Sequence, residues 1–255
     1  MPPSRVASSL RSLCTAVAVY LLASGLAARA QETQVTAQVE VLRSKTDKHG
    51  KKVSSTSGTE PSDVVIWLTP KDSVAPAASE SAQLLPRLVQ HHKQFEPRLV
   101  VVRVGTLVQF PNEDHFLHNV FSLYDGKRFD LGFYEAGSSR SVRFDRLGVS
   151  FLFCNIHPEM SAMVVAVDTP YFGISDGTGR IVVPTVPDGV YILHVWWERS
   201  LADELKGLER TVNISSSERA LGAIRMIENP KFTLAHKNKY GQDYAPPSSS
   251  DYSQP

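Results

Sequence analysis

The chain has 255 residues, and its 27 Lys and Arg residues nearly balance its 26 Asp and Glu residues. With 42% hydrophobic residues, 15 Gly and 16 Pro, the composition excludes a disordered tail, a collagen and a disulfide scaffold. The near-zero charge excludes a strongly basic nucleic-acid binder, so we expect no nucleic-acid partner. The length allows one large domain or two ordinary ones. The count of only two Cys is the informative number.

Residues 1–30 have the pattern of a secretory signal peptide. They contain three Arg and no acidic residue, and an apolar stretch over 13–26 precedes the small-residue sequence ARA. We predict cleavage after Ala30 and a periplasmic or secreted protein with no membrane span after cleavage. The apolar stretch is short for a bilayer span and is interrupted by Ser24 and Gly25. An uncleaved anchor is the alternative interpretation.

Removal of the signal peptide changes the cysteine count. It takes away Cys14 and leaves Cys154 as the single cysteine of the mature chain. One thiol cannot close an intramolecular disulfide, and in an oxidising compartment it is a liability unless it is buried or ligated. The sequence around Cys154 therefore needs a functional explanation.

Beyond the signal, short alternating apolar runs separated by Gly, Pro, Asn and Asp predict an all-β sandwich or barrel. The predicted strands span, in chain order, 35–42, 64–68, 99–104, 107–111, 119–123, 141–144, 148–153, 163–167, 171–175, 180–183, 191–196 and 210–214. Short helical turns are predicted only at 81–93 and 201–208. Polar or Ala/Ser/Pro-rich composition predicts loops at 44–62 and 71–81 and a mobile tail at 242–255.

Potential metal ligands concentrate where the predicted strand 148–153 ends. Cys154, His157 and Met160 arrive within seven residues in the run FCNIHPEM, so one compact loop can bring all three to one ion. Thiolate, imidazole and thioether form a soft donor set. Such a set fits copper far better than Mg²⁺, Ca²⁺ or structural zinc.

A second imidazole is available from His118, which lies 36 residues before Cys154 in the run FPNEDHFLHNVFS. Two His, one Cys and a weak axial Met make the trigonal site of blue copper. Each residue alone has an ordinary interpretation: Cys154 as a small buried hydrophobe, Met160 as core filler and His118 as a surface or core histidine. Their joint occurrence with the loop spacing and the export signal favours copper.

The pattern Asn112-x-Asp114-x-x-x-His118-Asn119, followed by CxxHxxM, resembles the cupredoxins, in particular the amicyanin and plastocyanin group. The closing loop, with Pro158 directly after the histidine, is most similar to amicyanin, and the resemblance spans about 95–167. It implies a Greek-key cupredoxin sandwich.

The resemblance also implies one type 1 copper ion, with His118, Cys154 and His157 as equatorial ligands and Met160 as axial ligand. Asn119 is implied to brace the ligand loop by hydrogen bonds near the Cys154 sulfur. The edge of His157 is implied to be the electron exit, within an apolar docking patch to which Pro158 and Phe116 contribute.

The flanking motifs SDGTGR (175–180) and VPDGVY (186–191), together with 35–42 and 63–70, resemble the carboxypeptidase regulatory-like, prealbumin-type sandwich. Their order predicts a smaller, discontinuous prealbumin or Ig-like sandwich with the cupredoxin inserted before Tyr171. The arrangement resembles exported plastocyanin-like proteins sometimes labelled methylamine-utilisation proteins. We predict a signal peptide at 1–30, first strands of the small sandwich at 31–70, a linker at 71–92, a cupredoxin domain at 93–168, the remaining carboxypeptidase regulatory-like sandwich at 169–216, and a C-terminal extension with the tail at 217–255.

The expected function is single-electron transfer between redox partner proteins that dock transiently, without catalysis. Cys154 is flanked by Phe153 and Asn155, whereas multicopper oxidases have relay histidines there, and no haem, GxSxG or HExxH motif occurs. Two alternatives remain: a binding module whose second sandwich docks a glycan, a cell-wall polymer or a protein, and a periplasmic copper carrier. His115 is interpreted as an exposed rim residue, and His91-His92 as part of a polar connection.

Overall fold

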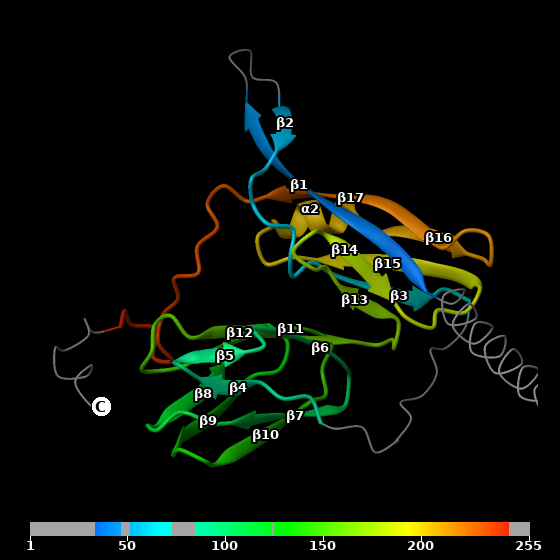
Figure 1. The fold of residues 1–255 in the computed structure, drawn as a ribbon. Coiled ribbons are helices and arrows are strands. Elements are labelled where there is room, and N and C mark those ends of the chain that lie inside the picture. The colour runs from blue at the N-terminus through cyan, green and yellow to red at the C-terminus, as the bar shows by residue number, and fades with distance from the viewer. Residues whose placement is uncertain (1–33, 47–51, 73–84, 124, 245–255) are drawn as a thin grey trace, which may run out of the picture.

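The computed structural model describes residues 34–46, 52–72, 85–123 and 125–244, and within them the protein is built almost entirely of strands. The predicted all-β fold class is confirmed. The strands form two units, drawn one above the other in Figure 1. The predicted signal peptide and residues 245–255 of the predicted tail lie outside the described residues. No helix in the described part of the chain has the length and apolarity needed to cross a membrane.

The upper unit is a sandwich of two sheets. One sheet has the order β14 (Arg180–Val183), β1 (Val35–Thr46) and β17 (Ala220–Glu228), with β2 (Lys52–Thr56) also paired to β1. The other has the order β13 (Phe172–Ile174), β3 (Val65–Pro70), β15 (Gly189–Trp196) and β16 (Arg210–Ile214). Its strands come from both sides of the lower unit in the sequence, so this sandwich is discontinuous, as the order of the motifs predicted. Its prealbumin type stays a prediction.

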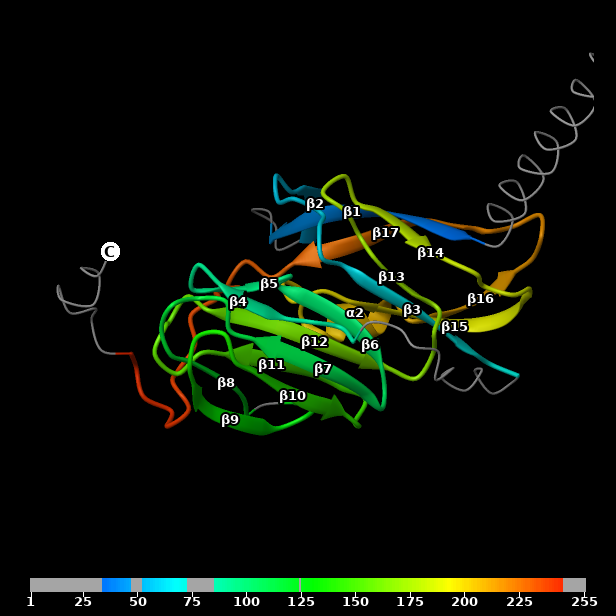
Figure 2. The ribbon, with the colours of Figure 1, turned by 60° about the horizontal axis from the view of Figure 1, so that its bottom comes forward.

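The lower unit places a five-stranded sheet against a smaller layer (Figure 2). The large sheet has the order β6 (Leu99–Arg103), β12 (Ser161–Val167), β11 (Gly148–Phe153), β8 (His118–Ser122) and β9 (Phe129–Tyr134). The smaller layer contains β7 (Thr106–Pro111), β10 (Ser139–Phe144) and the hairpin of β4 (Val89–His91) and β5 (Gln94–Glu96). A buried core that includes Val108, Phe110, Phe144 and Leu152 joins the two layers.

Strand β12 explains how the two units are held together. Six of its seven residues are buried, because alternate side chains enter different cores. Ala162, Val164 and Ala166 enter the core of the lower unit, whereas Met163, Val165 and Val167 enter a core shared with Val65 of β3. Near this shared core, the guanidinium of Arg98 donates two hydrogen bonds to the carboxylate of Glu198, at 2.6 and 2.8 Å. Both units therefore share apolar and polar contacts.

Several predicted elements were wrong. Strand β4 lies where a helical turn (81–93) and a linker (71–92) were predicted. The chain reverses at His92 and Lys93, so β4 pairs with β5. The predicted loop at 44–62 contains the end of β1 and all of β2, which form an antiparallel hairpin. The predicted C-terminal extension contains β17, which pairs in parallel with β1. The short helix α2 (Ala202–Gly207) confirms the turn predicted at 201–208.

Candidate metal centre

Two neighbouring strands bring the predicted ligands together. His118 begins β8, whose five residues are all buried, and Cys154 directly follows β11, which pairs with β8 through Phe153 and Phe121. His157 and Met160 lie on the loop from β11 to β12. That loop is closed by hydrogen bonds from the N–H of Cys154 to the Met160 carbonyl, at 3.2 Å, and from the N–H of Met160 to the His157 carbonyl, at 3.1 Å.

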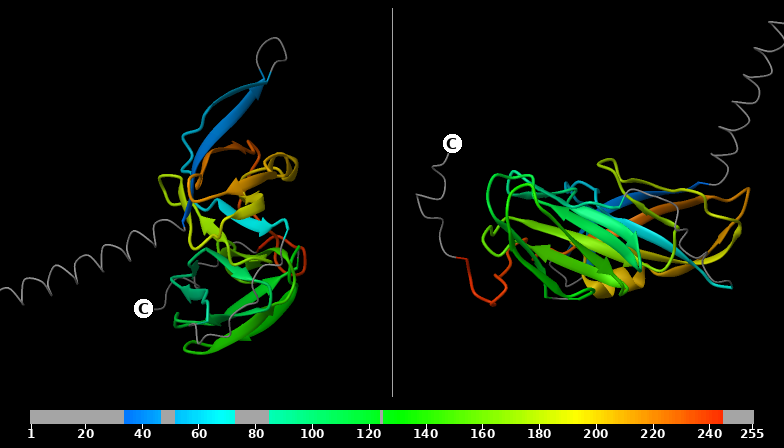
Figure 3. Two further views of the ribbon diagram at one scale, coloured as in Figure 1. Left: turned by 90° about the vertical axis from the view of Figure 1, so that its right-hand side faces the viewer. Right: turned by 90° about the horizontal axis from the view of Figure 1, so that it is seen from below.

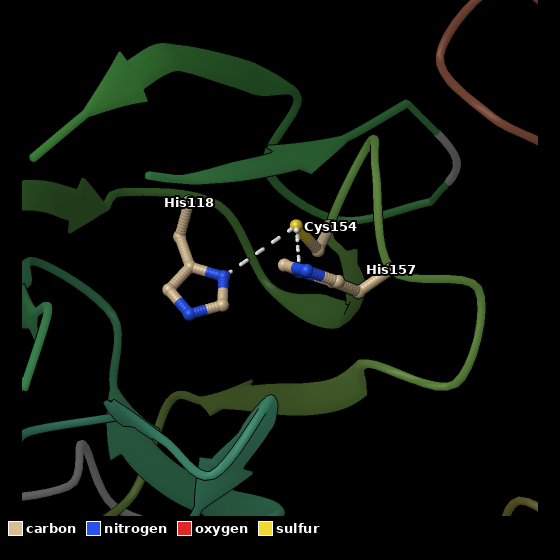
Figure 4. Close-up of side chains that lie close together, drawn as sticks. All are labelled: His118, Cys154 and His157. Carbon is tan, nitrogen blue, oxygen red and sulfur yellow. Dashed lines mark hydrogen bonds between the residues drawn. The ribbon is translucent and has the colours of Figure 1, made fainter. Parts of the chain in front are cut away.

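Three of the predicted ligands form a compact donor cluster (Figure 4). The Cys154 Sγ atom lies 3.8 Å from Nδ1 of His118 and 3.5 Å from Nδ1 of His157. The three donor atoms all lie within 4.8 Å of one another. Cys154 and His118 are fully buried, whereas His157 is half-buried. One ion can therefore be reached by a sulfur and two nitrogens, of which only the His157 imidazole extends toward solvent.

The protonation of the cluster suits a metal. Burial lowers the pKa of His118, although Asp114 partly offsets this effect. Burial, together with the charges of His118 and Lys93, lowers the pKa of His157 to about 4. Both imidazoles are therefore neutral near pH 7, with a lone pair available for coordination.

Two opposing effects act on the pKa of the Cys154 thiol. Burial raises its pKa. Four main-chain N–H groups oppose this shift by donating toward the sulfur, from Ile156, Asn119, His157 and Asn155. A bound metal deprotonates a coordinating thiol outright, and these N–H groups are in place to stabilise the resulting thiolate.

Asp114 orients the buried imidazole and was not assigned a role from the sequence. Its Oδ2 atom lies 2.7 Å from Nε2 of His118. Although burial opposes ionisation, the pKa of Asp114 is lowered by hydrogen bonds from the N–H of Lys93, from His118 and from the N–H of His92. An ionised carboxylate only accepts, so Nε2 carries the proton and Nδ1 is left free to face the sulfur. Asp114 belongs to the motif NEDHFLH, but only the folded loop shows that its side chain contacts His118 on β8.

Replacing Asp114 by alanine is expected to weaken Cu(II) affinity by about ten- to a hundredfold, because partners of this kind fix ring orientation and raise ligand basicity. Competition with a chromophoric chelator measures the affinity. Glu113→Ala is the matched control, since Glu113 forms a surface ion pair with Arg87 at 3.0 Å. Equal affinities of wild type and Asp114→Ala would refute the orienting role.

The other predicted site residues lie around the cluster. Met160 is fully buried in the same core as Cys154. The side chain of Asn119 donates to Asp130 at 2.8 Å and not to the ligand loop; only its main-chain N–H points to the sulfur. Pro158 is exposed beside His157.

Exposed apolar residues adjoin His118 and His157, either by ring contact or along the chain. Phe116 is 40% exposed, and its ring lies 5.7 Å from the His157 ring and 5.1 Å from the His118 ring. Leu117 and Ile156 are also exposed, at 51% and 45%. We define the apolar collar as Phe116, Leu117, Ile156 and Pro158. Sequence reasoning named two of these four residues and missed Leu117 and Ile156, which flank predicted ligands.

The segment after β17 contacts the back of the ligand loop. Figures 1 and 3 show this segment, coloured orange to red, leaving the upper unit and ending against the lower one. The Tyr244 hydroxyl donates to the Cys154 carbonyl at 2.6 Å, and the N–H of Lys239 donates to the Asn155 side chain at 3.0 Å. The His236 ring packs 4.1 Å from that of Phe153. Part of the predicted mobile tail thus supports the loop that carries Cys154.

Tyr244→Phe is expected to lower the free energy of unfolding by about 1–2 kcal/mol, because it removes the hydrogen bond to the Cys154 carbonyl and the contact of the hydroxyl with Nδ1 of His236 at 3.2 Å. Burial raises the pKa of Tyr244, so its hydroxyl remains a donor at neutral pH. Urea denaturation measures the loss. Tyr240→Phe, at a position 70% exposed, serves as the control and should change little. Equal losses in the two variants would contradict a specific contact of Tyr244.

Comparisons with known proteins concern part of the chain. No protein-family model matches it, and no curated protein does. Among solved structures, the Cu-containing nitrite reductase NirK from Thermus scotoductus SA-01 is 24% identical over 37% of this chain, with a TM-score of 0.33. The chain covers only 25% of that enzyme.

Two smaller proteins are covered almost completely. A purple cupredoxin from Nitrosopumilus maritimus is 22% identical over 32% of this chain and 99% of its own, with a TM-score of 0.30. Amicyanin from Paracoccus versutus is 20% identical over 40% of this chain and 97% of its own, with a TM-score of 0.31. Such scores carry no conclusion about function, and the three proteins include an enzyme.

Proposed function

We propose that this chain is an exported type 1 copper protein that carries single electrons between redox partners. The observation that carries this function is a fully buried, unpaired thiol whose sulfur faces Nδ1 of two neutral imidazoles. The donor set distinguishes copper from other metals. Hard cations such as Mg²⁺ and Ca²⁺ need oxygen ligands, and structural zinc does not ordinarily take Met, whereas His₂Cys with a weak axial Met suits blue copper.

In this function His118, Cys154 and His157 would hold the metal, and Met160 would supply a fourth, weaker donor. Copper bound there supplies one-electron chemistry between Cu(II) and Cu(I). The chain keeps the donors in one arrangement: β8 and β11 fix two of them, Asp114 fixes the ring of His118, and the loop hydrogen bonds fix His157. A site that changes little between oxidation states transfers electrons with little rearrangement.

The apolar collar supports the route of the electron. Among His118, Cys154 and His157, only His157 is not fully buried, and the exposed ring of Phe116, a residue of the collar, lies 5.7 Å from its ring. Redox partners that exchange electrons rapidly use small, weak interfaces of this kind, typically below about 1,200 Å². We propose that partners dock on the collar, that the chain acts without catalysis of its own, and that it works in the periplasm or outside the cell after cleavage following Ala30.

The test is the visible absorption and EPR spectrum of the full chain after loading with Cu(II). An intense thiolate-to-copper charge-transfer band with a type 1 EPR spectrum is expected. A Cu(II) adduct without this intense band would overturn the proposed function. His115→Ala serves as the control, because this exposed histidine lies outside the cluster and should leave the band unchanged.

Met160→Leu is expected to retain copper and to change the reduction potential, because an axial ligand tunes the potential without being required for binding. The volume-conserving swap costs less than about 1.5 kcal/mol, so the fold persists. Protein-film voltammetry measures the potential. Met163→Leu is a matched control, since Met163 lies three residues away and enters the core between the two units. Equal potentials in the wild type and Met160→Leu would exclude Met160 as the axial ligand.

A further inference from the structure

The hairpin of β4 and β5 gathers a second set of metal-binding side chains. In its register His91 pairs with Gln94 and Val89 pairs with Glu96, so His91 and Glu96 are diagonal neighbours on one face. The opposite face carries the buried residues Gln90 and Phe95. Nδ1 of His91 lies 4.0 Å from Oε2 of Glu96. The outward face of the hairpin therefore carries an imidazole and a carboxylate side by side.

The turn adds the third side chain. His92 and Lys93 are the two central residues of the turn, with φ of 52° and 57°, a left-handed conformation that favours Gly and Asn. The ring of His92 lies 3.7 Å from that of His91. Donor atoms of His91, His92 and Glu96 all lie within 4.8 Å of one another. A histidine has thus been placed where the backbone favours a smaller residue, which is a feature of functional positions.

The turn is also anchored. The N–H of His92 donates to Oδ1 of Asp114 at 2.7 Å, and that of Lys93 donates to Oδ2 at 3.0 Å. The same carboxylate contacts His118. Asp114 therefore limits the movement of the turn, so the backbone that carries the second cluster is held in place before any ligand binds.

We propose that His91, His92 and Glu96 form a second metal site for a divalent transition-metal cation, of which Zn²⁺ is the representative. Two imidazoles and a carboxylate are the ligand types that zinc takes in sites that keep an open position for water. Coordination at about 2 Å requires the three donor atoms to approach one another further. The side chains of His91 and Glu96 are 39% and 56% exposed, so rotation about their side-chain bonds meets little packing.

This site differs in chemistry from the thiolate cluster and does not rest on the proposed function. It lacks sulfur, so a Cu(II) ion bound there would give no thiolate charge-transfer band, and a bound Zn²⁺ ion would be redox-inactive. Zinc is therefore the probe that separates the two sites. It can be added to the copper-loaded chain while the visible band reports whether copper is displaced.

The experiment is calorimetric titration of the copper-loaded full chain with Zn²⁺ alone. One equivalent of Zn²⁺ is expected to bind while the visible band is retained, and the double variant His91→Ala/His92→Ala is expected to lose this equivalent. Glu96→Gln, which leaves the turn intact, is expected to weaken binding. His115→Ala, an exposed histidine outside the cluster, is the control and should bind as wild type does.

Two outcomes would overturn the second site: no Zn²⁺ equivalent in the wild type, or undiminished binding in both the double-histidine and Glu96→Gln variants. Failure of the blue copper function is seen separately, as a missing band. In that case the titrations are repeated on the metal-free chain. The difference of one Zn²⁺ equivalent between wild type and the double variant then decides the question.

Discussion

Cys154→Ser is expected to abolish the visible charge-transfer band completely while leaving the chain folded. The substitution preserves shape in a fully buried position but replaces a sulfur that can become a thiolate by a hydroxyl that does not ionise near neutral pH. The band arises from the copper–thiolate bond, so Cu(II) still bound by His118 and His157 should show only weak visible absorption. Absorption and EPR spectra of the Cu(II)-loaded wild type and Cys154→Ser chains measure the change. The variant should lose the type 1 hyperfine pattern and show that of Cu(II) without a thiolate ligand.

The control for this experiment must show that the fold survives. Far-UV circular dichroism and the thermal midpoint of the Cys154→Ser chain should resemble those of the wild type, because the four N–H groups around the sulfur can also donate to a hydroxyl oxygen. A band that persists in Cys154→Ser would remove Cys154 from the metal centre. It would also remove the observation on which the proposed function rests.

Met163→Ala is expected to lower the free energy of unfolding by about 2–5 kcal/mol, the range for truncating a large buried side chain. Met163 is 1% exposed and enters the core shared by the two units, together with Leu99, Val165 and Val65. A cavity there weakens both units at once. Because they share this core, we also expect urea to unfold the whole chain in a single transition, in the wild type and in the variant.

The three tryptophans make this measurable, since all of them lie on β3 or at the end of β15, outside the lower unit. Trp197 reports on the core of the upper unit, and Trp67 and Trp196 report on the core shared by the two units. The visible band of the copper-loaded chain reports on the lower unit. Coincident transitions are expected. Leu147→Ala, at a residue 58% exposed, is the control and should change the stability by no more than about 0.5 kcal/mol. Separate transitions for the two probes would show that the shared core does not couple the units.

Local patterns in the sequence were enough to predict much of the candidate site. Cys154, His157 and Met160 lie within one loop, so their spacing alone indicated a shared centre before any fold was known. His118 was identifiable as a donor by its residue type and by its place before a predicted strand. Its approach to Cys154 depended on the pairing of β8 with β11, because strand order is set by contacts between distant segments.

Other parts of the site were beyond local patterns. The β4 strand was missed because its three residues are too few to show a period, and its hairpin turns on His and Lys where Gly or Asn is usual. The contact from Tyr244 to Cys154 joins residues that are 90 positions apart in the sequence, and Tyr244 lies in a segment with no regular structure. The composition of that segment does not show whether it packs against the ligand loop or extends as a tail.

The sequence by itself determined the all-β class, and it contains the pattern of an export signal and a set of soft donor side chains around Cys154, because each depends on composition or on neighbours along the chain. Only the tertiary structure decided which residues orient those side chains and what covers them. Strand β12 illustrates the reason: its apolar run predicts a buried strand, but the assignment of Ala162, Val164 and Ala166 to one core and of Met163, Val165 and Val167 to another depends on the two sheets that pack against it. Asp114 likewise becomes a partner of His118 only when β8 and the β4–β5 turn lie on either side of it.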